Sequence, residues 1–163
     1  MRIELIQPFI NSADAVLAQG LESPIAVENL TMDEEAYRRK GIAAEIAVTG
    51  DIEGRIIFDV DEKTAVSLAR NLGADPAGAG DMASEAVCEL ANQIIGNAIT
   101  VLNDQGFHFR VHPPKVHTSE QGSKSSEDTE AVVLCLSADD TKLFMNVALR
   151  YRHRPMESAT AAN

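Results

Sequence analysis

The sequence predicts an α+β fold in which helices pack on a largely antiparallel sheet, in two layers. Three observations support this prediction. Apolar residues recur at helical spacing near the N-terminus and again in a long segment at the middle of the chain. Before and after that long segment, pairs of β-branched runs are joined by short polar turns, which is typical of antiparallel hairpins.

Length and composition are those of one folded domain. The chain has 163 residues, of which 45% are hydrophobic, enough for a single compact core. We expect the domain to span residues 1–154. The remaining segment, residues 155–163 (PMESATAAN), has too little apolar surface to bury and is expected to be disordered.

The net charge of −11 argues against binding to nucleic acid or to an anionic membrane, because both need basic patches. The acidity is interpreted first as an aid to solubility and second as attraction to a partner with a basic patch. Cys88 and Cys135 form no CxxC motif, so neither a redox motif nor a zinc site is indicated. No signal-peptide pattern and no run near the ~20 apolar residues of a membrane span occurs, so a cytoplasmic protein is expected.

The N-terminal segment, residues 5–19, has apolar residues at helical spacing. Because proline is tolerated only in the first turn of a helix, Pro8 predicts that this helix starts near Gln7. Gly20 predicts its end.

Strands are predicted next. Residues 24–32 form one, and the charged residues 33–40 form an exposed loop or a strand extension. Residues 41–60 form a hairpin of two β-branched runs. The turn chemistry of this hairpin is supplied by Gly50, Asp51 and Gly54.

A short helix is predicted over residues 61–73. Asp61 can cap its N-terminus, Arg70 lies in its last turn, and Gly73 can end it. Residues 74–80 form a linker.

The C-terminal third is predicted to be mostly strand. Residues 107–117 alternate and contain a Pro-Pro break, and residues 118–130 form a polar, mobile hairpin loop. Residues 131–138 and 142–152 form two strands joined by a tight turn at 139–141.

A long helix is predicted over residues 81–103, closed by Asp104 and Gly106. With ~100° of rotation per residue, four residues fall within about 60° of one another on the helix surface. They are Glu85, Glu89, Asn92 and Gly96. The opposite side is apolar and is predicted to face the sheet through Val87, Leu90, Ala91, Ile94, Ala98, Val101 and Leu102.

The simplest interpretation of this polar line is a solvated helix face, but two details argue for a contact surface instead. No Lys or Arg occurs between Asp81 and Asn103, although exposed helix faces usually mix both signs of charge. Gly96 costs ~1 kcal/mol relative to alanine in a helix interior, and a residue without a side chain lets another molecule come close. Glu89 and Asn92 project side by side at i and i+3. A carboxylate can hold an ammonium group, and a carboxamide can orient a water molecule.

The segment ELANQIIGNA, residues 89–98, resembles the signature of the CheX-type chemotaxis phosphatases, within the wider CheC, CheX and FliY group. This signature is Glu-x-x-Asn followed by Gly and Asn. IELIQPFINSADAVL is similar to the family's opening helix, and GRIIFDVDEKTAVSLARNLG to its strand-then-helix segment. HPPKV follows the long helix where the family has a proline. The likeness covers about residues 1 to 150, and the four pieces occur in the family's order.

The resemblance implies a CheC/CheX-like fold and hydrolysis of the aspartyl phosphate of a CheY-like response regulator. By position, Glu89 pairs with the lysine of the receiver and Asn92 positions the attacking water. Catalysis of this kind is mostly positioning and electrostatics. The receiver supplies the Mg²⁺, so no cofactor and no metal site are expected in this chain.

The resemblance also implies a homodimer. One functional site per chain is expected, because Pro8 stands where a second signature would place an acidic residue before Asn11. The family usually has Asp or Ser at the position of Glu85. Glu85 is therefore not assigned a catalytic role. It is assigned to partner binding, together with Gln93 and Gly96. Pro113 and Pro114 are both interpreted as structural.

Other functions remain open from the sequence. One alternative is a non-catalytic CheX-like module that docks a receiver or dimerises in a signalling pathway, and another is an unrelated small-molecule-binding domain. His108 and His112 have the spacing of metal ligands on a strand but no evident third ligand, so they are interpreted as surface residues. The serines lack a G-x-S-x-G context, which argues against a serine hydrolase.

Overall fold

The computed structural model describes residues 3–21, 26–33, 41–71, 82–117, 131–138 and 141–152. Its helices are α1 (Ile3–Leu21), α2 (Glu62–Asn71) and α3 (Ala83–Asp104). Its strands are β1 (Ala26–Asp33), β2 (Ile42–Gly50), β3 (Ile52–Val60), β4 (Phe109–Val111), β5 (Lys115–His117), β6 (Ala131–Ala138) and β7 (Thr141–Tyr151). Within these ranges, no helix combines the length and the apolar character needed to cross a bilayer.

The strands form one antiparallel sheet in the order β1-β6-β7-β3-β2-β4, with β5 also paired to β2. The β2–β3 and β6–β7 pairs are the two hairpins that the sequence predicts. β4 and β5 lie along the same edge of β2, and Pro113 and Pro114 separate them. A proline pair interrupts an edge strand easily because proline has no N–H to donate to a ladder.

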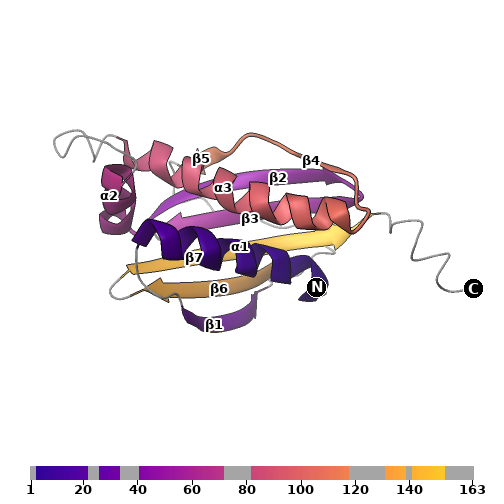
Figure 1. Cartoon of the computed structure of the whole chain (residues 1–163), viewed down its shortest axis with the longest axis horizontal. Helices are drawn as coiled ribbons and strands as arrows, with labels where there is room; N and C mark the ends of the chain where they lie inside the picture. The colour runs from indigo at the N-terminus through magenta and orange to yellow at the C-terminus, as the bar shows by residue number, and fades with distance from the viewer. Residues whose placement is uncertain are drawn as a thin grey trace, which may run out of the picture.

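The helices cover one face of this sheet, which confirms the predicted two-layer α+β fold (Figure 1). α1 and α3 lie side by side on that face, and α2 contacts the N-terminal part of α3. The core lies between the layers, with fully buried side chains that include Phe9, Ile46, Ile56, Phe58 and Ile94.

The start of α1 differs from the prediction. The helix begins at Ile3 and contains Pro8 in its interior. Leu5 and Ile6, which precede the proline, are almost fully buried in the core. Their burial outweighs the one helical hydrogen bond that Pro8 cannot make.

The β2–β3 hairpin closes within the predicted turn region. The last residues paired between these two strands are Val48 and Gly54, so residues 49–53 connect the paired parts, and Gly50 has a φ of 124°. Gly54, predicted as a turn residue, lies inside β3 with a φ of 138°. A Cβ at this position would lie 1.9 Å from the carbonyl oxygen of Ala148 on β7, so Gly54 permits the close pairing of β3 and β7.

The ends of α2 and α3 follow local chemistry. The Asp61 carboxylate accepts a hydrogen bond from the Thr64 backbone N–H at 2.6 Å, which confirms the predicted cap. After α3, the Gly106 N–H donates to the Asn103 carbonyl at 2.9 Å, and Gly106 has a φ of 95°. The helix therefore stops where the sequence predicts.

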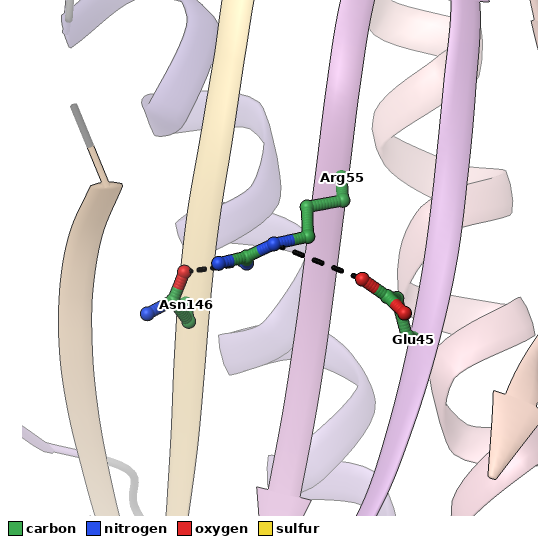
Figure 2. A network of polar contacts seen from close by, with 3 residues as sticks. All are labelled: Glu45, Arg55 and Asn146. Atoms are coloured by element: carbon green, nitrogen blue, oxygen red, sulfur yellow. Dashed lines mark hydrogen bonds and ion pairs between the residues drawn. The ribbon is translucent and has the colours of Figure 1, made fainter. Parts of the chain in front are cut away.

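The face of the sheet opposite the helices carries a buried polar group (Figure 2). The Arg55 guanidinium donates to the Asn146 side chain at 2.7 Å and lies 3.7 Å from a Glu45 carboxylate oxygen. These residues come from β3, β7 and β2, three neighbouring strands. The network therefore ties together the strands that support the helices.

Several predicted segments lie outside the described residues. They are the charged segment 34–40, the linker 74–80 with Gly73, the loop 118–130 and the tail 155–163.

Candidate functional site

The candidate site is a line of exposed residues along α3, here called the α3 stripe. It consists of Glu85, Glu89, Asn92 and Gly96. All four are exposed, as the helical wheel predicts. The opposite side of α3 packs on the sheet through Val87, Leu90, Ala91, Ile94, Ala98 and Leu102, all buried. The burial of that side fixes the direction in which the stripe points.

One residue of the predicted apolar side of α3 is not buried. Val101 is 45% exposed and lines a hollow between α1 and the C-terminal half of α3. A helical wheel considers one helix alone, so it cannot show which residues of its apolar side a neighbouring helix leaves uncovered.

The two signature side chains differ in their surroundings. The Gln93 carboxamide donates to a Glu89 carboxylate oxygen at 3.3 Å, so Gln93 orients the glutamate one turn before it. The described part of the chain offers the Asn92 carboxamide no hydrogen-bond partner. Among the described residues, Asn92 is thus unengaged and Glu89 accepts a hydrogen bond from its neighbour.

A recess lies next to the carboxylates of the stripe. It has a volume of about 190 Å³ and lies between α2 and α3, with Glu85 and Glu89 on its α3 side. Its other lining residues, Ala69, Met82 and Ala86, are apolar. An apolar recess with carboxylates on one side suits a lysine side chain, whose stem is apolar and whose end is cationic.

Gly96 lies at the far end of the stripe. A Cβ at this position would meet no atom within 4 Å. The packing of the protein itself therefore does not require glycine here. The helix accepts the conformational cost of Gly96 without an internal reason, which is expected where another molecule makes contact.

Cys88 lies on the same helix, half-buried and packed against the core. Burial raises the pKa of its thiol above the ordinary value, and the neighbouring Glu85 carboxylate raises that pKa further. A thiol that stays protonated is a poor nucleophile, so Cys88 has the packing role that the sequence predicts. Cys135 is buried in β6, also as predicted.

Two histidines belong to the β4 segment and not to the α3 stripe. His108 and His112 are both exposed and lie on either side of β4. A ring nitrogen of His112 shares a hydrogen bond with the Thr49 hydroxyl at 3.1 Å. Across the described ranges, no group of three or more His, Cys, Asp or Glu residues is arranged to hold a metal ion.

A family model described as the chemotaxis phosphatase CheX matches residues 42–137, a range that includes the whole of α3. The chain belongs to the CheX family. Among curated protein sequences, none matches this CheX-family chain.

Solved structures agree with this family. A CheC-like superfamily protein from Shewanella sp. PV-4 has a TM-score of 0.79 at 18% identity, covering 92% of this chain and 99% of its own. The chemotaxis protein CheX of Vibrio vulnificus has a TM-score of 0.75 at 22% identity, covering 90% and 99%. At these identities the likeness shows the fold.

A third structure is of a complex. CheX from Borrelia burgdorferi, crystallised as a CheX–CheY–BeF₃–Mg²⁺ complex, matches with 29% identity and a TM-score of 0.62, covering 91% of this chain and 99% of its own. That CheX protein therefore binds CheY. Membership of the CheX family, together with this related complex, supports a role of the CheY-phosphatase type for this chain.

Proposed function

We propose that this chain hydrolyses the aspartyl phosphate on the receiver domain of a CheY-like response regulator. The observation that carries the proposal is an exposed Glu-x-x-Asn signature on α3 of a CheX-family fold. Glu89 and Asn92 point to solvent from a helix whose other side is fixed by the core.

The proposed chemistry is in-line displacement at phosphorus. The Asn92 carboxamide holds a water molecule, whose oxygen attacks the phosphorus atom. The bond between phosphorus and the aspartyl oxygen breaks, and inorganic phosphate and the receiver's aspartate carboxylate are released. Asn92 contributes by fixing the direction of the water, because transfer of a phosphoryl group requires attacking and leaving oxygens in line.

Glu89 is proposed to bind the receiver's lysine. Its carboxylate lies at the recess between α2 and α3, whose apolar lining with carboxylates on one side suits the apolar stem and cationic end of a lysine. Glu85 lines the same recess and strengthens the attraction without touching the phosphoryl group. The Mg²⁺ of the reaction is proposed to come with the receiver, where it neutralises charge on the phosphoryl oxygens.

The first prediction concerns Asn92→Ala. We expect kcat for dephosphorylation of a phosphorylated receiver to fall on the order of 10²-fold, because misplacing a reacting group has an effect of this size. The free energy of unfolding is expected to change little, since Asn92 is exposed. Glu89→Ala is expected to raise KM as well as lower kcat, because it removes the charge that holds the receiver.

Asn103→Ala is the matched control, with the same substitution on an exposed position of the same helix. The assay follows loss of radiolabelled phosphate from purified receivers of the same organism. A fully active Asn92→Ala variant, or a wild type that accelerates no receiver, contradicts the proposal. Binding of a receiver without acceleration supports the non-catalytic docking module instead.

The homodimer and the cytoplasmic location implied by sequence remain predictions. Light scattering on the purified full chain measures the first directly, and a mass of one chain contradicts it.

A further inference from the structure

Met82 lies at the start of α3 and lines the recess between α2 and α3 together with Glu85 and Glu89. Its side chain is 43% exposed, which among the large apolar side chains of the described residues is matched by Val101 at 45%. A single exposed apolar side chain is common on protein surfaces. The informative feature of Met82 is therefore its position beside two carboxylates.

Met82 lies on the same side of α3 as the carboxylate that is proposed to hold the receiver's lysine. With ~100° of rotation per residue, Met82 falls within about 20° of Glu89 and about two turns before it. Val101 falls about 120° away from Glu89, where it lines the hollow between α1 and α3. Of these two similarly exposed apolar side chains on one helix, Met82 alone belongs to the recess.

The fold itself makes little use of the Met82 side chain. The Met82 carbonyl accepts a hydrogen bond from the Ala86 N–H at 2.9 Å, so its backbone begins the hydrogen bonding of α3. The side chain forms no cap hydrogen bond at this end of the helix, and its exposure excludes it from the core. Much of an apolar side chain therefore stays uncovered at the recess.

The recess also has no counter-charge from its own helices. Lys63 and Arg70 lie on α2, yet within the part of the chain that the structure describes neither forms an ion pair with Glu85 or Glu89. Carboxylates without a counter-charge attract a cationic group from a partner. Because the rest of the lining is apolar, the side chain that fits is a lysine, with its stem against Met82 and its ammonium group at the carboxylates.

We propose that Met82 is a contact residue for the receiver and packs against the stem of the lysine whose ammonium group Glu89 holds. This inference rests on the proposed function. Methionine suits such a contact, because its unbranched thioether side chain adapts to the surface that it meets. A contact made away from the reacting atoms binds the phosphorylated receiver and the transition state equally well. Met82 therefore sets the affinity for the receiver and not the rate of hydrolysis.

The test measures Kd for receiver domains of the same organism, each loaded with beryllofluoride and Mg²⁺. Met82→Ala removes the contact, and Met82→Leu keeps an apolar side chain of similar size. Val101→Ala is the matched control, since it truncates an equally exposed apolar side chain on another side of α3.

We expect Kd to rise about fivefold in Met82→Ala and to stay within about twofold of wild type in Met82→Leu and Val101→Ala. In the phosphatase assay, KM for the phosphorylated receiver should rise by the same factor in Met82→Ala, whereas kcat should stay within about twofold of wild type.

The outcomes separate this inference from the proposed function. A wild type that hydrolyses the phosphoaspartate, together with a Met82→Ala variant that binds as tightly as wild type, overturns the contact and leaves the function standing. A wild type that binds a loaded receiver but accelerates no hydrolysis overturns the function. The contact is then decided by the Kd of Met82→Ala alone.

Three other results also overturn the contact. An equal loss of affinity in Val101→Ala would show that the effect is not specific to the recess. A Met82→Leu variant that binds as weakly as Met82→Ala would show that apolar packing is not the cause. A wild type that binds no loaded receiver would contradict both the contact and the proposed function.

Discussion

The thiol of Cys88 shows how one carboxylate of the α3 stripe acts on its surroundings. Burial is the larger cause of its raised pKa, and the Glu85 carboxylate is the second cause.

We expect Glu85→Gln to lower the pKa of Cys88, because it removes the negative charge that opposes loss of the proton. The pKa should still stay above the ordinary value, since burial remains. The pH dependence of alkylation by iodoacetamide measures this, with Cys88→Ser as the control that removes the signal. An identical pH dependence in wild type and Glu85→Gln would show that this carboxylate does not act on the thiol.

The raised pKa also fixes the direction of one stability effect. Above the ordinary pKa of a cysteine, the unfolded chain loses the Cys88 proton before the folded chain does. The contribution of Cys88 to the free energy of unfolding is therefore complete below that pH, and it is lost as the pH rises through the folded-state pKa.

At the scale of the element, α3 carries a residue that weakens it. Gly96→Ala is expected to stabilise the protein by about 1 kcal/mol, because alanine favours helix and the added Cβ meets nothing within 4 Å. The same methyl group projects from the α3 stripe, so we expect kcat/KM for a phosphorylated receiver to fall about tenfold. Thermal unfolding and the phosphatase assay measure the two effects on the same sample.

Asn103→Ala again serves as the control, since it places alanine on the same helix without filling a glycine position. A Gly96→Ala variant that is more stable and fully active would mean that no partner approaches Gly96. A variant that is less stable would mean that the added methyl group clashes within the protein, so that the fold itself requires glycine at this position.

The sequence predicts elements well where the information is local. The polar line on α3, the Asp61 cap and the two hairpins depend on residues that are close along the chain, and the structure has all of them. Predictions failed where the conformation or exposure of a residue depends on a segment that is distant in the sequence. Gly54 has the composition of a turn residue, but its conformation serves the approach of β7. Val101 has the periodicity of a core residue, but its exposure depends on where α1 lies.

The start of α1 is a third case of this kind. Pro8 alone predicts a start at Gln7. The helix starts earlier, at Ile3, because Leu5 and Ile6 are buried in the core. That core is built on β3 and β7, which come from distant parts of the sequence. For the same reason, the hollow between α1 and α3 is invisible in the sequence, since β1, β2, β3 and α2 separate its two walls along the chain.

At the scale of the whole molecule, charge is unevenly placed. The chain has a net charge of −11, and α1 and α3 carry acidic residues and no basic ones. The third helix, α2, lies beside the recess and carries Lys63 and Arg70 as well as Glu62. On the sheet, in contrast, Glu53 pairs with Arg150 and Glu45 lies 3.7 Å from Arg55. α1 and α3 therefore contribute a negative potential on the side where the receiver is proposed to dock.

We expect salt to weaken this attraction. When sodium chloride rises from low to physiological concentration and beyond, kcat/KM for the phosphorylated receiver should fall several-fold while kcat stays constant. The reason is that steering acts on association, and the Debye length shortens to ~8 Å at physiological ionic strength. Glu85→Gln should show a shallower salt dependence than wild type, because it removes one of the charges, whereas Asn103→Ala should keep the slope of wild type. A kcat/KM that does not change with salt would mean that the acidity of the helical layer serves solubility alone.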